Sequence, residues 1–299
     1  MRRSARRRSG CWSLGGGSPE IDRELKQLDE RVARLPQHSL VETALPELCD
    51  PQDGGPLAEL MRAMASTFAD AFGPSREGLG VSKKERVDPR SGLPIRNEIA
   101  AWVGALGIGE WELYVGGHDP HGVTAVATEL PALVVGSKVQ APLSPMYRQA
   151  VARELFALRR GTTLLRHRDA SDIAALVVAT CKLAGSDVPA PPYAMLGEFQ
   201  RQLGKVASRR IRKLLPELVR PLVERRFDTL AWARAAIASL DRMAALAAGD
   251  VSHVLAPTLA ERGHLGSSAE ARERARRILS FVLSPTYLKL RSQLGMGVR

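Results

Sequence analysis

The residues whose types and spacing come nearest to supporting chemistry lie in the stretch Arg153-Glu154-Leu155-Phe156-Ala157. Positions 153 and 157 are four residues apart, so on a helix they project from the same face. Two histidines at that spacing can bind a zinc ion, and a glutamate beside the first can act as general base for an attacking water. This chain keeps Glu154 but has Arg153 and Ala157 where the histidines would stand.

Neither replacement can bind a metal ion. The Arg153 guanidinium group is a permanent cation with no lone pair to donate, and the Ala157 methyl group has no donor atom. Without a metal-activated water, Glu154 has little effect as a general base. We therefore predict that Glu154 is a buried acid paired with a neighbouring arginine, and that these positions hold no catalytic residue, metal ion or cofactor.

Other candidate sites have simpler interpretations. His118 and His121 flank Asp119-Pro120, a pattern typical of an exposed β-turn, and no other histidine stands at ligand spacing to them. The glycines of residues 104–109 precede a predicted strand and lack the Lys-Ser/Thr of a phosphate-binding loop. No G-x-S-x-G elbow indicates a serine hydrolase.

The elements expected around Glu154 are a helix, a small sheet and a second helix. The pattern predicts a helix over residues 95–106 and then three β-rich runs at residues 110–115, 122–127 and 132–135. Ser144-Pro145 is a favourable start for the helix of about residues 145–160 that carries Glu154. We expect this helix to pack against the sheet.

Helical periodicity dominates the rest of the chain. Before the sheet we predict helices at residues 21–35 and 56–72 and a loop at 75–93. The apolar run 173–181 is half as long as a membrane span and predicts a buried helix. After residue 145 the pattern is helical, with breaks expected at Gly161, residues 185–192, Pro216, Gly249 and residues 263–268.

Residues 201–226 combine a basic face with an apolar one. They contain nine Lys or Arg residues against Glu217 and Glu224, and their apolar residues recur at helical spacing. The predicted helix is therefore buried on one side and basic on the other. Its basic face is either ordinary solvated surface, a docking surface for an acidic partner, or a nucleic-acid site, although aromatic residues that would stack on bases are sparse.

Three consecutive segments carry a resemblance to a known family. Residues 131–136, 143–145 and 148–157 are similar to the strand, loop and active helix of the gluzincin zinc peptidases related to CAAX prenyl proteases. They also resemble the degenerate peptidase-like region at the C-terminal end of long tetratricopeptide-repeat proteins of myxobacteria and their relatives. The resemblance extends over roughly residues 90–255.

The resemblance implies a third metal ligand, a glutamate on a later helix in an E-x-x-A-D-like segment. The nearest match is Ile237-Ala238-Ser239-Leu240-Asp241-Arg242, which places Ile237 at the ligand position. The three ligand positions are then occupied by Arg153, Ala157 and Ile237, and only Glu154 and Asp241 agree with the catalytic pattern. The resemblance therefore implies a peptidase-like fold without its metal site.

Composition suits a globular protein with a basic N-terminal tail. The 299 residues are 44% hydrophobic and 25% charged, with a formal net charge of +11. Setting aside the five arginines among the first eight residues leaves +6. We expect a disordered Arg/Gly-rich tail at residues 1–20 that binds polyanions weakly, a helical segment and loop at 21–89, and a degenerate peptidase-like domain at 90–299.

Cysteine usage and hydropathy indicate the cytoplasm. Cys11, Cys49 and Cys181 are widely separated and odd in number, so they form neither a disulfide framework nor a metal-binding pair. The arginine-rich start is not followed by the apolar run of a secretory signal, and no segment is long enough to span a membrane.

These features together predict an α+β fold that is predominantly helical, with a small β-sheet packed on the helix that carries Glu154. The function expected is that of a non-catalytic interaction or scaffold module with a protein partner, for which an acidic protein is one option. Two alternatives stay open: an active hydrolase with atypical metal ligands, and a basic nucleic-acid-binding protein.

Overall fold

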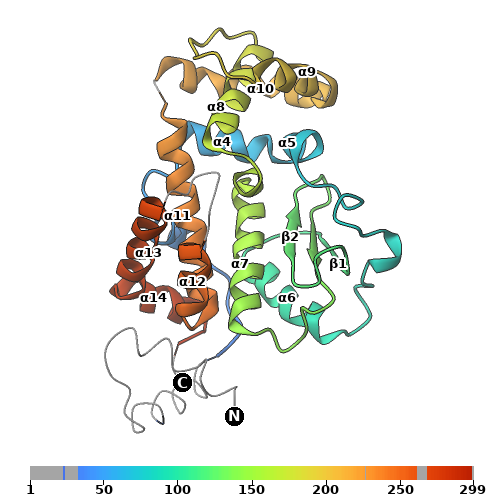
Figure 1. Ribbon diagram of the computed structural model, residues 1–299, viewed down its shortest axis with the longest axis vertical. Coiled ribbons are helices and arrows are strands. Elements are labelled where there is room, and N and C mark those ends of the chain that lie inside the picture. The colour runs from blue at the N-terminus through green and yellow to red at the C-terminus, as the bar shows by residue number, and fades with distance from the viewer. Residues whose placement is uncertain (1–22, 24–32, 226, 261–267, 298–299) are drawn as a thin grey trace.

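The protein is a predominantly helical α+β structure, as the sequence predicts, with one small sheet beside its central helices (Figure 1). The computed structural model describes residues 23, 33–225, 227–260 and 268–297. None of the helices in these ranges is long and apolar enough to cross a membrane.

The described elements follow in chain order. Before the sheet come η1 (Glu42–Ala44), α3 (Leu45–Leu48), α4 (Gly55–Ala63), α5 (Ala65–Phe72), η2 (Lys83–Glu85) and α6 (Pro94–Ala105). The strands are β1 (Glu112–Val115), β2 (Val123–Val126) and β3 (Ala132–Val135). After them come α7 (Pro145–Arg160), η3 (Thr163–Arg166), α8 (Ala170–Leu183), α9 (Leu196–Val206), α10 (Arg209–Glu224), α11 (Thr229–Ala248), α12 (Ser252–Ala260), α13 (Ser268–Val282) and α14 (Pro285–Gln293).

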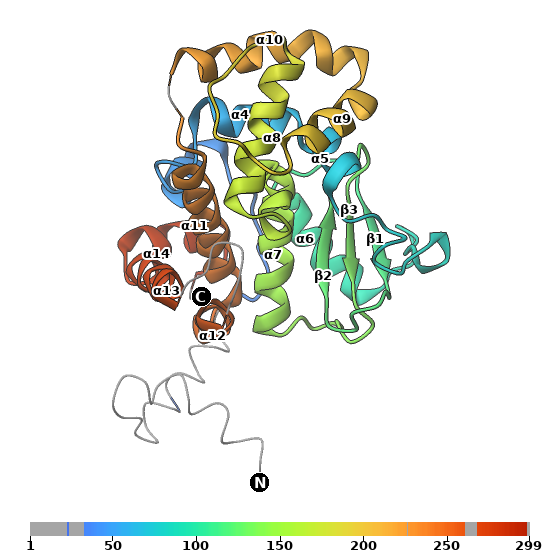
Figure 2. The same ribbon diagram turned by 45° about the horizontal axis from the view of Figure 1, so that its top comes forward.

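The three strands form a mixed sheet in the order β1-β3-β2. β3 lies in the middle, parallel to β1 and antiparallel to β2, so that Val134 pairs with Tyr114 on one side and Thr124 on the other. All three strands and α6 lie where the sequence predicts them. The order leaves β2 at an edge of the sheet, facing α7 (Figure 2).

Helix α7 begins and ends as its sequence predicts. The Ser144 hydroxyl oxygen accepts a hydrogen bond from the backbone N–H of Tyr147, and Pro145 occupies the first turn, where no N–H is needed. At the other end Gly161 adopts a left-handed conformation with φ 70°. The N–H of Thr162 then donates to the carbonyl of Ala157, a closing turn that directs the chain back along the helix.

Two large apolar cores meet along α11. One core joins α6, the inner face of the sheet, most of α7, the second half of α11, and α13 and α14. The other joins α4, α5, α8, α9 and α10 with the first half of α11. Helices α4 and α5, from the segment assigned to residues 21–89, thus share a core with helices far along the chain. Where the domain boundary lies remains a prediction.

The N-terminal part differs from the sequence expectation in two places. The stretch predicted as one helix at residues 56–72 is two helices, because the backbone turns at Met64 (φ −95°, ψ 0°) and both halves then reach the same core. The predicted tail and the helix at 21–35 lie outside the described residues except for 23 and 33–35. Residues 33–35 are not helical, and the chain that follows is bonded to Leu294 and Ala105.

The C-terminal part brings two further corrections. The predicted break at Pro216 is wrong: α10 continues through it, because Pro216 faces solvent while Leu215 and Val219 hold the helix in the core. The stretch 201–226 is not one helix, because Ser208 caps a new helix by accepting from the N–H of Ile211. The breaks at Gly161, at residues 185–192 and at Gly249 are confirmed, and residues 263–267 lie outside the described ranges.

Replacing Gly161 with alanine should destabilise the protein more than the same change at Gly185. Both glycines have left-handed backbones, which cost about 1 kcal/mol for alanine. A Cβ at Gly161 would also lie 2.6 Å from the Arg62 Cα of α4, whereas one at Gly185 would meet nothing within 4 Å. We expect Gly161→Ala to lower the free energy of unfolding by about 3 kcal/mol. Urea titrations measure both variants, and equal losses would contradict the predicted clash.

Candidate functional site

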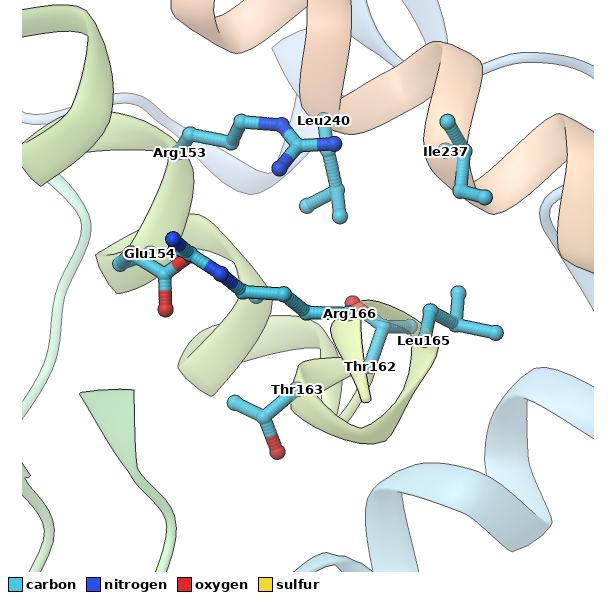
Figure 3. A pocket seen from close by; sticks show the side chains of 9 residues that line it. Arg153, Glu154, Thr162, Thr163, Leu165, Arg166, Ile237 and Leu240 are labelled. Carbon is cyan, nitrogen blue, oxygen red and sulfur yellow. The ribbon is translucent and has the colours of Figure 1, made fainter. Parts of the chain in front are cut away.

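The motif positions converge on one pocket although they come from distant parts of the sequence. Arg153, Glu154 and Ala157 lie on α7, which packs between β2 and α11. Ile237 lies on α11 and lines the same pocket (Figure 3). The predictions that the first three residues share a helix and that this helix packs on the sheet are confirmed.

The pocket is small and partly open to solvent. Its enclosed space is about that of a single water molecule, so it can hold one small atom or the tip of a larger group. Besides the four motif positions, its walls come from the turn after α7 and from α11, and comprise Thr162, Thr163, Leu165, Arg166 and Leu240.

Glu154 is buried, and both of its carboxylate oxygens are engaged. Oε2 accepts a hydrogen bond from the backbone N–H of Ala125 at 2.9 Å, and Oε1 accepts one from the Arg166 guanidinium group. The prediction that this glutamate is a buried acid paired with a neighbouring arginine is confirmed. Both hydrogen bonds favour the ionised carboxylate and fix its position against the sheet.

The pair of Glu154 and Arg166 also closes the edge of the sheet. Arg166 donates a second hydrogen bond, of 3.0 Å, to the carbonyl of Val123 on β2. Val123 and Ala125 direct these backbone groups away from β3, toward the side where an added strand would bind. Two side chains thereby satisfy edge groups that would otherwise attract another extended chain.

Arg153 and Asp241 form the second charged contact of the pocket. Arg153 Nη2 lies 3.6 Å from Asp241 Oδ1, while Arg274 of α13 donates to both Asp241 oxygens at 3.0 Å. Asp241 is buried and primarily held by Arg274. Within the described residues, the Arg153 guanidinium group forms no hydrogen bond, and its side chain is 24% exposed.

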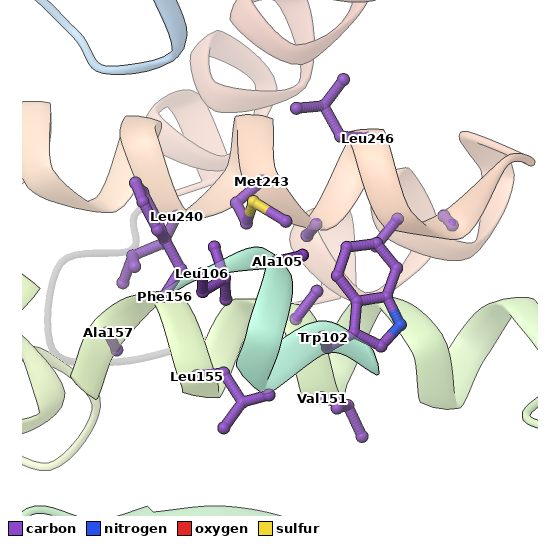
Figure 4. Packing of buried hydrophobic residues seen from close by; sticks show 14 of the residues in the cluster. Trp102, Ala105, Leu106, Val151, Leu155, Phe156, Ala157, Leu240, Met243 and Leu246 are labelled. Carbon is purple, nitrogen blue, oxygen red and sulfur yellow. The ribbon is translucent and has the colours of Figure 1, made fainter. Parts of the chain in front are cut away.

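The donor set does not fit a zinc ion. Arg153 brings a positive charge, and Ala157 and Ile237 bring only carbon atoms. Ala157 also belongs to the apolar core around Phe156 and Met243 (Figure 4). In the described part of the chain, no group of three or more His, Cys, Asp or Glu side chains is placed to hold a metal ion. The chemistry available here is charge pairing and hydrogen bonding.

Thr162 and Arg166 line the pocket but escape the sequence analysis. Thr162 is 2% exposed, and its Oγ1 has no hydrogen-bond partner. A buried hydroxyl group without a partner carries a desolvation cost, which makes it a notable feature of the pocket. In the sequence, the one residue that could have indicated their position is Gly161, because its left-handed turn folds the following residues back toward Glu154.

A second buried polar cluster lies where α7 and α11 meet the loop after α3. Arg160 contacts Asp53 at 3.2 Å, and Ser239 Oγ accepts from the backbone N–H of Asp50. Burial raises the pKa of Asp53 and of the Cys49 thiol, although Arg160 opposes both shifts. A buried thiol with a raised pKa is a poor nucleophile. Burial likewise raises the pKa of Cys181 to about 11.

The remaining sequence candidates are separate from the pocket. His118 and His121 lie on the connection between β1 and β2, where Pro120 and His121 form a turn, as predicted. His121 Nδ1 is 2.6 Å from the Tyr147 hydroxyl oxygen of α7. The basic residues between positions 201 and 220 are divided between α9 and α10, at the end of the molecule where these helices pack with α8.

No protein-family model, curated protein or solved structure matches this chain. Its function must therefore be argued from the pocket and the surfaces themselves.

Replacing Thr162 with valine should not destabilise the protein, whereas the same change at Thr180 should. Thr162 Oγ1 has no partner, so its loss removes a desolvation cost and we expect a gain of about 1 kcal/mol. Thr180, also fully buried, donates to the Leu176 carbonyl at 2.8 Å and should lose about 1 kcal/mol. Urea unfolding measures the free energy of unfolding of both variants. If Thr162→Val loses as much of it as Thr180→Val, the Thr162 hydroxyl group has a hydrogen-bond partner after all and the prediction is wrong.

Proposed function

We propose that this protein is a non-catalytic interaction module built on a degenerate gluzincin-like scaffold. The observation that carries the proposal is the convergence of Arg153, Glu154, Ala157 and Ile237 on a single pocket in which the three ligand positions, 153, 157 and 237, have no atom that can bind a metal ion. Fold likeness alone does not establish function, so the argument rests on these side chains.

The arrangement supports the alignment on which the resemblance depends. Ile237 and Asp241 were matched to an E-x-x-A-D-like segment by sequence alone, and both lie on the side of α11 that faces α7: Ile237 lines the pocket and Asp241 contacts Arg153. An alternative alignment would have to explain the same convergence.

The engagement of Glu154 argues against the hydrolase alternative. A hydrolase at this pocket would need a nucleophile or an activated water, and the carboxylate that would activate it is bonded to Arg166 and Ala125. The pocket contains no histidine or cysteine, and its two hydroxyl groups, on Thr162 and Thr163, have no histidine beside them. Binding is the role that this set of groups can perform.

A second surface is suited to an acidic partner. Lys205, Arg209, Arg210 and Lys213 are exposed around the start of α10. Positive side chains at a helix N-terminus add to the positive end of the helix dipole, so the local potential favours anionic groups. We infer a protein partner with acidic character, and a reducing cytoplasmic location that agrees with the free buried thiols of Cys49 and Cys181.

Zinc binding tests the alignment directly. We expect the natural protein to contain no stoichiometric zinc, and the triple variant Arg153→His, Ala157→His, Ile237→Glu to bind zinc because it supplies three ligands around one pocket. The double variant without Ile237→Glu is the matched control and should bind at least tenfold more weakly. Elemental analysis and competitive titration measure both.

One zinc ion per natural molecule, together with a hydrolytic activity lost both on chelation and in Glu154→Gln, would replace this proposal with the hydrolase alternative. Equal zinc affinity in the double and triple variants would show that position 237 is wrongly aligned.

Retention on heparin tests two hypotheses: that the N-terminal arginines bind polyanions, and that the protein binds nucleic acid. Five of the first eight residues are arginine. Such a dense cluster of positive charge binds a polyanion by releasing its counterions, and this needs no shape complementarity. We expect deletion of residues 1–17 to abolish most retention, and the variant Arg209→Gln, Arg210→Gln, Lys213→Gln to keep most of it. The eluting salt concentration is the readout. If the α10 variant loses most retention and the deletion variant keeps it, α10 is the polyanion-binding segment and the nucleic-acid alternative is favoured.

A further inference from the structure

The two most exposed large apolar side chains of the described structure lie on either side of the turn between α13 and α14. Leu283 is 83% exposed and Leu288 is 68% exposed, whereas the next in rank, Val41, is 52% exposed. Leu279, one helical turn before Leu283, is 40% exposed. Exposed leucines gathered in this way mark a surface that another apolar group covers.

Two of these leucines belong to a longer stripe along α13. Its members follow at intervals of four, three and four residues, the spacing that places side chains on one face of a helix, and all are exposed: Arg272, Arg276, Leu279 and Leu283. This α13 stripe is basic at one end and apolar at the other. It lies on a helix at an outer edge of the molecule (Figure 1, Figure 2).

The same chain contains a segment with the complementary pattern. Ile21, Leu25, Leu28 and Val32 recur at the same intervals of four, three and four residues, which predicts an amphipathic helix. Residues 20–32 contain five acidic and three basic residues, although the chain as a whole has a net charge of +11. Apolar side chains for the leucines and acids for the arginines therefore occur together in one segment.

Arg23 is the one described residue between positions 21 and 32, and it agrees with this pattern. Its backbone is helical and its side chain is exposed. At about 100° per residue, position 23 lies about 200° around a helix from Ile21, opposite the apolar residues. An exposed side chain there is expected if the apolar face of the segment is the one that contacts the protein.

The chain enters the described structure close enough to reach the α13 stripe. The backbone N–H groups of Gln37 and His38 donate to the carbonyl of Leu294 at 2.8 and 3.3 Å. Leu288 lies about 9 Å before Leu294 along the helix axis. The five residues from Val32 to Gln37 can span about 16 Å when extended. A helix over residues 21–32 would be about 18 Å long, and the stripe is about 16 Å long.

We propose that residues 21–32 form a helix that covers the α13 stripe, parallel to α13, with Leu28 against Leu279 and Val32 against Leu283. In this arrangement the acids at positions 22 and 24 lie near Arg272 and Arg276. A tethered segment has an effective concentration in the millimolar range, an advantage over a second copy or a partner protein that must bind from solution. The inference goes beyond the proposed function, because none of the pocket residues belongs to α13 or α14.

Disulfide cross-linking of the full chain tests the proposed contact. In a Cys11→Ser background, the pair Leu28→Cys and Leu279→Cys should form an intramolecular disulfide under mild oxidation. The matched control replaces Leu28→Cys with Glu30→Cys, which is nearer the entry point of the chain but on the opposite helix face. We expect the control to link at least tenfold more slowly, as measured by mass spectrometry of digested samples.

Hydrogen exchange tests the same contact without added cysteines. In the natural chain, the amides of residues 24–32 should exchange at least tenfold more slowly than those of residues 9–17. The variant Leu279→Ser, Leu283→Ser should remove this protection. Leu214→Ser, which changes a leucine on α10 that is 46% exposed, should leave it intact. Unchanged exchange in α7 shows that each variant is folded.

Three results would overturn the proposal. If no disulfide forms, or if the Glu30→Cys control links as fast, residues 21–32 do not present their apolar face to α13. If the disulfides join two chains, a second copy covers the stripe. If residues 24–32 exchange as fast as residues 9–17, or keep their protection in Leu279→Ser, Leu283→Ser, the stripe is left for a partner protein.

Discussion

The contact between α7 and α11 is the interaction on which the rest of the structure depends. α11 is rich in alanine, and residues such as Ala244 and Ala248 are fully buried, so its backbone can approach α7 closely. Each helix also makes other contacts, because α7 packs against β2 and α11 belongs to both apolar cores. The pocket lies where the two cores meet, with Ile237 in one and Leu240 in the other.

The polar residues of α7 join this helix to the rest of the chain. Glu154 connects it to Arg166 and the sheet edge, and Arg160 connects it to Asp53 in the loop after α3. Burying such groups is tolerable only because each has a partner of opposite charge. Arg153 makes a longer contact, of 3.6 Å, with Asp241, which Arg274 also holds.

A hydrolase and a binding module would use the same pocket in different ways. Hydrolysis requires a metal or nucleophile and a base that can take up a proton, which means groups left under-bonded until the substrate arrives. Here each oxygen of the Glu154 carboxylate accepts a hydrogen bond from the protein, and the side chains at positions 153, 157 and 237 have no lone pair to give to a metal ion.

The sequence by itself determined the helix that carries Glu154 and the three strands, because caps and periodicity are local properties. It also correctly indicated that Glu154 pairs with an arginine. It did not identify that arginine as Arg166, or the unpartnered hydroxyl of Thr162, because both reach the pocket only through the left-handed turn at Gly161. It placed a break at Pro216, where packing against the core outweighs the local preference of proline. Which donors are left free depends on three-dimensional pairing among α7, α11 and α13, and no local pattern encodes that outcome.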